Sequence, residues 1–173
     1  MGDRYFPTAH VHALTRKFPV VTMTLGQRLS GASGVQESVG FDEHGEVFRQ
    51  AADRLREQSW LSLAEPPALE DVVSVYQGYV RRQMELGHPP AVNEAEDCVL
   101  LPAAAGLPKL AERSLAIVEE VSANWPSARL PLNWSSRQEW LTELAGKAKN
   151  HAELTACVES QIAYHKLDKI PTV

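Results

Sequence analysis

Two strand-like runs open the chain: Thr8-Ala-His-Val-His-Ala-Leu-Thr15 and Phe18-Pro-Val-Val-Thr-Met-Thr-Leu25. Both are rich in β-branched residues, and apolar and polar side chains alternate along them, as in strands that bury one face. Only Arg16-Lys17 separates the runs, so we predict an antiparallel β-hairpin, although this pair lacks the Gly or Asn that two-residue turns favour. Pro19 has no N–H to donate to a ladder, which indicates an edge position.

The rest of the chain has the period of amphipathic helices, after a small and polar segment over residues 30–40 that we predict to be a mobile loop. We expect about five helices, with starts indicated by capping residues or prolines at Asp42, Pro66-Pro67, Pro108, Ser136 and Asn150. Ser136-Arg137-Gln138-Glu139 fits a capping box, and Asn150 is followed by Glu153 at the same spacing.

Each expected helix has one apolar face. The residues of these faces are Val47, Phe48, Ala51 and Leu55; Leu69, Val72, Val73, Tyr76, Val80 and Met84; Leu110, Ile117, Val118 and Val121; Trp140, Leu141 and Leu144; and Leu154, Val158 and Ile162. A hairpin is marginal alone and needs a covering layer. The predicted fold is therefore α+β and mostly helical, with an N-terminal β-hairpin or small antiparallel sheet packed by about five α-helices, in a single domain over residues 1–173.

Composition narrows the class of protein. The 173 residues are 44% hydrophobic and 23% charged, as in ordinary globular domains. The net charge is −5 and no basic cluster stands out, so we expect no nucleic-acid partner. The longest apolar run, residues 98–108, is interrupted by Pro102 and Gly106 and is too short for a membrane helix. Without a signal-like N-terminus, we expect a cytoplasmic protein with Cys98 and Cys157 as thiols.

His10-Val11-His12 is the sharpest chemical pattern. Side chains at i and i+2 of a strand project to one face, so two imidazoles could share a metal ion. An acid such as Glu43 or Glu46, brought close by the fold, would complete such a site for metal-dependent hydrolysis or small-ligand binding. The simpler interpretation is a pair of solvent-facing histidines, with the alternate residues inward: Ala9, Val11 and Ala13.

Loop tryptophans and acids are the candidates for a partner surface. Trp60, Trp125 and Trp134 lie at expected helix ends, where indoles offer large and rigid contact area or fold back onto the core. The partner contacts we predict are Glu94, Glu96, Asp97, Trp125 and Trp134. The alternative for the three acids is a solvated helix N-terminus.

No complete catalytic motif occurs, and we expect no cofactor; an enzyme is the less favoured class. The hairpin from His10 to Leu25, the helix ending in Trp60-Leu61, and Pro67-Ala68-Leu69-Glu70-Asp71-Val72-Val73 together resemble small uncharacterised bacterial domains, some of which stand beside polymorphic toxins as immunity proteins. The resemblance covers the first half of the chain and identifies no binding residue. It implies a non-catalytic, antitoxin-like inhibitor whose acidity suits a toxin with a basic cleft. The alternative is a metal-dependent hydrolase or small-ligand-binding protein using His10 and His12.

Overall fold

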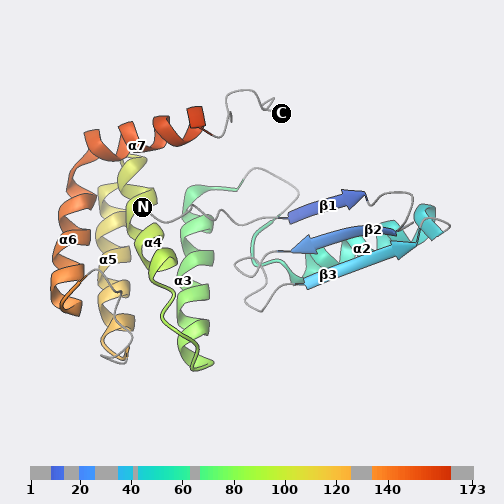
Figure 1. The fold of residues 1–173 in the computed structure, drawn as a ribbon, viewed down its shortest axis with the longest axis horizontal. Helices are drawn as coiled ribbons and strands as arrows, with labels where there is room; N and C mark the ends of the chain where they lie inside the picture. The colour runs from blue at the N-terminus through green and yellow to red at the C-terminus, as the bar shows by residue number, and fades with distance from the viewer. Residues whose placement is uncertain are drawn as a thin grey trace. The chain divides into compact units, whose positions relative to one another are not determined.

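The computed structural model describes residues 9–13, 20–25, 35–40, 43–62, 67–125 and 134–164 (Figure 1). These residues form three strands and six helices, so the prediction of a mostly helical chain is confirmed. The chain divides into two compact units, Met1–Arg82 and Gln83–Val173, which are described in turn. The single domain over residues 1–173 stays a prediction.

The first unit contains an antiparallel sheet in the order β1-β2-β3. Its strands are β1 (Ala9–Ala13), β2 (Val20–Leu25) and β3 (Val35–Gly40). The prediction of a loop over residues 30–40 is therefore wrong at its second half, where β3 pairs with β2. Its glycine and serine content is typical of loops, but Val35, Glu37 and Val39 keep the period of two that a strand requires.

A small core joins the sheet to two helices, α2 (His44–Gln58) and α3 (Leu69–Glu85). α2 contacts β2 and β3. The buried residues of this core are Val39, Ala51, Leu55, Leu61 and Val75, with Val47, Phe48, Ala52 and Val72 packed at its margin. The apolar face predicted for α2 is thus confirmed, and the first turns of α3 close the same core.

An ion pair also fixes α2 against the sheet. Arg54 donates from Nε to Oε1 of Glu37 at 3.1 Å and from Nη2 to Oε2 at 2.8 Å. This two-point hydrogen bond with the guanidinium lowers the pKa of the Glu37 carboxyl. The carboxylate consequently stays ionised, and keeps its hold on α2, at a pH where an isolated glutamate would begin to be protonated.

The second unit contains four helices, and α4 contacts the other three. They are α4 (Val92–Ala104), α5 (Pro108–Ser122), α6 (Arg137–Lys149) and α7 (His151–Tyr164). The expected count of about five helices missed α4. Pro102 suggested a break, yet it is buried within the last turn of this helix. The helix ends instead at Ala104, and the chain turns away at Gly106, where φ is +73° and the following Leu107 N–H donates to the Pro102 carbonyl at 2.9 Å.

Two stacked tryptophans organise the core of the second unit. The Trp140 ring is fully buried, and its centroid lies 5.2 Å from that of Trp125, which follows α5. Trp140 Nε1 donates to Glu96 Oε1 of α4 at 2.8 Å. Because the buried N–H finds a carboxylate acceptor, the largest side chain of this core is accommodated without an unsatisfied polar group.

The predicted caps of α6 and α7 are present. Ser136 Oγ accepts from Glu139 N–H at 3.1 Å, and Asn150 Oδ1 accepts from Glu153 N–H at 3.3 Å. The Glu139 carboxylate accepts from Ser135 N–H and Oγ, which lowers its pKa.

The prediction that α7 buries its apolar face is wrong. Leu154 and Val158 are only half-buried, and Ile162 is 38% exposed. α7 contacts α4 and α6, but none of its residues is buried. Its cap and apolar period are therefore enough to form the helix but do not place it within the core.

Two further expectations concern helices and thiols. Among the described helices, none has the length and apolar character needed to cross a membrane. Cys98 is a buried free thiol, as predicted, and Cys157 is a half-buried free thiol on α7.

Replacing the central indole should strongly destabilise the second unit. Trp140→Ala removes a fully buried ring, its stacking on Trp125 and the donor to Glu96, so we expect a loss of about 3–5 kcal/mol in the free energy of unfolding. Guanidinium denaturation measures it. The control is Gln138→Ala, an exposed position of the same helix, which should change stability by less than about 0.5 kcal/mol. Equal stability of the two variants would contradict the assigned core.

Candidate functional site

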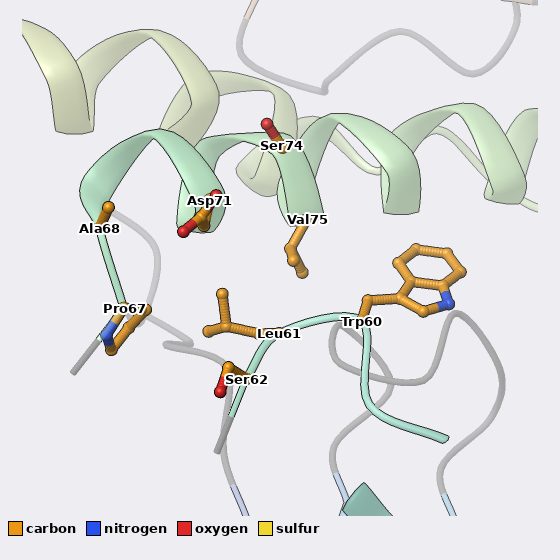
Figure 2. Close-up of a pocket in the computed structure, with 8 residues that line it drawn as sticks. All are labelled: Trp60, Leu61, Ser62, Pro67, Ala68, Asp71, Ser74 and Val75. Atoms are coloured by element: carbon orange, nitrogen blue, oxygen red, sulfur yellow. The ribbon is translucent and has the colours of Figure 1, made fainter. Parts of the chain in front are cut away.

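An open pocket of about 530 Å³ lies in the first unit, between the end of α2 and the first turns of α3. Figure 2 shows the residues that line it: Trp60, Leu61, Ser62, Pro67, Ala68, Asp71, Ser74 and Val75. Its volume lies within the range of about 300–1,000 Å³ that is common for ligand pockets. Because the lining includes an exposed indole, this pocket is the candidate functional site.

A local turn determines which of two neighbouring side chains enters the core. α2 ends at Gln58, and Ser59 has an extended backbone. Ser59 Oγ donates to the Leu61 carbonyl at 2.7 Å and lies 3.3 Å from Leu61 N–H, which donates to it. Leu61 is buried in the core with Val75, whereas Trp60 stays 45% exposed. The turn therefore presents the indole at the surface.

The indole also has a fixed place against α3. A Cβ atom added at Gly78 would lie 3.3 Å from Cζ3 of the Trp60 ring. This separation is closer than Cβ contacts usually are, so the ring occupies space that a side chain at position 78 would need. Trp60 is thus both exposed to solvent and packed on the one residue type that leaves room for it.

The polar groups of the pocket are two serines and one carboxylate. Ser74 Oγ donates to the Glu70 carbonyl at 2.8 Å, within α3. Asp71 is exposed and contributes the only charged side chain among the described residues of the lining. Figure 2 shows Asp71 and Val75 projecting from α3 toward Leu61. The pocket consequently joins apolar walls to one negative charge.

The acids predicted to bind a partner lie on α4. Glu94 is buried, with 8% of its surface exposed, and Asp97 is half-buried. Glu96 is also half-buried and accepts the Trp140 hydrogen bond described above. Burial limits the area that Glu94 could offer to a partner, Glu96 is bonded to Trp140, and the acidic contact patch stays a prediction.

The two tryptophans predicted as partner contacts have different environments. Trp125 is buried, at 9% exposure, and stacks on Trp140, so it belongs to the core. Trp134 is half-buried and precedes α6; its Nε1 donates to Glu143 of that helix, and Lys147 Nζ lies 5.9 Å from the ring centroid. The stacking on Trp140 gives Trp125 a structural role, and Trp125 and Trp134 as partner contacts stay predictions.

His10 and His12 lie on β1, opposite Thr24 and Thr22 of β2. Their side chains lie outside the described part of the structure, so the two-imidazole site stays a prediction. Within the part of the chain that is described, no group of three or more His, Cys, Asp and Glu residues is arranged to hold a metal ion. Glu43 and Glu46, the two acids proposed to complete the site, are both exposed at the start of α2.

No protein-family model, curated protein or solved structure matches this chain. The resemblance to immunity-type bacterial domains consequently stays a prediction. Sequence reasoning placed Trp60 at an expected helix end, among three tryptophans that could offer contact area, and this was the available signal for the pocket. It could not show that Gly78 of α3 lies against the Trp60 ring, or that Asp71 of the same helix lines the pocket.

A pair of glycine substitutions tests the contact between Trp60 and α3. Gly146→Ala, at an exposed position of α6 with open space around it, should stabilise the protein by about 0.5–1 kcal/mol, since alanine favours a helix over glycine. Gly78→Ala should gain clearly less, because the new methyl group must displace the indole. Urea denaturation of both variants measures the difference. Equal gains would contradict the placement of Trp60 on Gly78.

Proposed function

We propose that this chain is a non-catalytic protein-binding domain that acts in the cytoplasm and contacts its partner through the Trp60 pocket. One observation carries the proposal. Trp60 is 45% exposed, yet the turn at Ser59 and the contact with Gly78 hold it in place beside the apolar wall of Leu61 and Val75.

A fixed and exposed tryptophan is well suited to protein recognition. It offers a large apolar area, and ordering its few rotatable bonds costs little entropy when they are already restrained. Tryptophan is also among the residues that contribute most to binding when they lie beside a pocket that excludes water. Pro67 and the Trp60 ring supply the exposed apolar surface against which a partner side chain would pack, with the buried Leu61 and Val75 beneath it.

The narrower form of the proposal is an immunity-type inhibitor of a toxin with a basic cleft. Two features support it: the net charge of −5, and the resemblance of the first half of the chain to domains of that kind. Opposite charge accelerates association with a basic cleft, and an acidic surface that covers the cleft blocks it.

Trp60→Ala tests the proposed contact. Peptides selected on the immobilised full chain from a random phage-displayed library provide the probe, and their affinity is measured by calorimetry. We expect Trp60→Ala to weaken binding about tenfold or more, as for a central interface tryptophan. Because the ring is half-exposed, unfolding transitions should show that the variant remains folded.

Trp134→Ala is the matched comparison, since it removes a half-buried indole that precedes α6 in the second unit. It should leave peptide affinity unchanged. Selected peptides that bind the Trp60→Ala variant as tightly as the unmodified protein would refute the pocket as the contact site, and loss of affinity only in Trp134→Ala would restore the earlier prediction.

The strand register favours one second candidate, a metal site at His10 and His12. Directly opposed residues of antiparallel strands share a face, and Val39 marks the face that packs with α2 in the core. By alternation, the positions of the other face are His10, His12, Val20, Thr22, Thr24, Gln36, Ser38 and Gly40, of which six are polar residue types. A polar face carrying two imidazole positions suits a divalent transition metal, as the alternative of a metal-dependent hydrolase or small-ligand-binding protein requires.

Metal content measures this second candidate directly. After incubation of the untagged chain with zinc and dialysis, elemental analysis should find stoichiometric metal, and the double variant His10→Ala, His12→Ala should lose it. His88→Ala removes an exposed imidazole elsewhere and should retain it. A metal-free unmodified protein would eliminate the candidate.

A further inference from the structure

We infer that the segment that docks in the Trp60 pocket is cationic: a stretch of a partner protein with a large apolar side chain next to an arginine or lysine. This inference rests on the proposed function and adds the chemistry of the partner. The inference is argued from two properties: the apolar residues that line the pocket, and the negative charge of the sequence that contains them.

The apolar walls define the first half of the partner's chemistry. Leu61 and Val75 are buried in the core and border the pocket, while Trp60 and Pro67 are exposed around it. Figure 2 shows the Leu61 and Val75 side chains between Trp60 and Asp71. An apolar side chain seated there would pack on the exposed indole and on Pro67, which removes apolar surface from water.

Charge defines the second half. Between Arg56 and Arg81 the sequence contains four carboxylate residues and no lysine or arginine. These acids are Glu57, Glu65, Glu70 and Asp71. The sequence between these two arginines therefore carries only negative charges, and Asp71 is the one among them that lines the pocket. A carboxylate in the lining repels an anionic segment and attracts a cationic one.

Asp71 is the carboxylate placed to receive the cation. Its backbone N–H donates to the Ala68 carbonyl at 3.1 Å, in the first turn of α3, and its side chain lines the pocket. No side-chain hydrogen bond or ion pair joins it to another residue in the described ranges. An acid in the first turn also interacts favourably with the helix dipole. If that were the only role of Asp71, the pocket would show no preference for a cationic partner.

Arginine fits this arrangement better than lysine. Its planar guanidinium donates two parallel hydrogen bonds to a carboxylate and stacks on aromatic faces, and both an acid and an indole border the pocket. A segment with an apolar residue followed by arginine would use the wall and the carboxylate together. The same chemistry is expected of a protein with a basic cleft.

Matched synthetic peptides separate these contributions. The peptides share a central Leu-Phe pair in a Gly/Ser background and differ only in two flanking residues, which are Arg, Gln or Glu. A fourth peptide carries the Arg residues without the Leu-Phe pair. Fluorescence anisotropy of labelled peptides, titrated with the full chain at low and high salt, gives the affinities.

We expect the Arg peptide to bind more tightly than the Gln peptide, and the Gln peptide more tightly than the Glu peptide. Asp71→Asn should reduce the ratio of the Arg-peptide affinity to the Gln-peptide affinity about fivefold. It should also remove much of the salt dependence of Arg-peptide binding. Glu112→Gln, which makes the same change in net charge at an exposed position of α5, should leave the preference intact. The Arg peptide without Leu-Phe should bind more weakly than the Arg peptide that contains it.

The outcomes distinguish this inference from the proposed function. Equal affinity for the Arg and Gln peptides, with both lost in Trp60→Ala, would overturn the cationic partner while supporting the pocket. An Arg preference that survives Asp71→Asn would overturn the assignment to Asp71. If no peptide with Leu-Phe binds better than the one without it, the pocket is not a docking site and both proposals fall.

Discussion

Leu61 is buried with Val75 while its neighbour Trp60 is half-exposed, and the candidate site depends on this division. Consecutive residues in extended backbone point in opposite directions, so only one of the two can enter the core. Ser59 makes the choice definite, because its hydroxyl donates to the Leu61 carbonyl and accepts from the Leu61 N–H. The alternative, with the indole inside and the leucine outside, would need a larger cavity than the small core around Val39 and Leu55 provides.

The helices with one clear apolar stripe could be predicted from the sequence. In α6, Ser136 begins the helix and Trp140, Leu141 and Leu144 are buried, as their spacing indicates. In α4 the same reasoning failed, since a helix that contacts three others is apolar on most sides and shows little periodicity. Pro102 then weighed too heavily: it lacks the N–H that would donate to the Cys98 carbonyl, yet the helix continues through it to Ala104. β3 was missed for a related reason, because its pairing with β2 is a long-range interaction that loop-like composition concealed.

The site was harder to predict than the fold, because each of its residues depends on a partner that is distant in sequence. Glu96 looked like part of an exposed acidic patch, but it accepts a hydrogen bond from Trp140, 44 positions away in the chain. Trp125 looked like a loop residue available to a partner, but it stacks on the same Trp140. The exposure of Trp60 likewise depends on Gly78, in a helix that follows it.

The three tryptophan environments also explain why residue type alone was a poor guide to function. A buried indole N–H requires an acceptor, and the structure supplies Glu96 to Trp140. Trp134 has an acceptor at the surface in Glu143, which together with Lys147 keeps the ring on α6. For Trp60 the restraint is instead steric: the turn at Ser59 and the bare surface of Gly78 orient the ring while about half of it still faces water. Restraint without burial is the property that a binding residue needs, since the entropy of ordering the side chain is lost on folding and not on association. Of these three residues, Trp60 is therefore the one whose environment matches recognition of a partner, although the sequence analysis named Trp134, and not Trp60, among the predicted contacts.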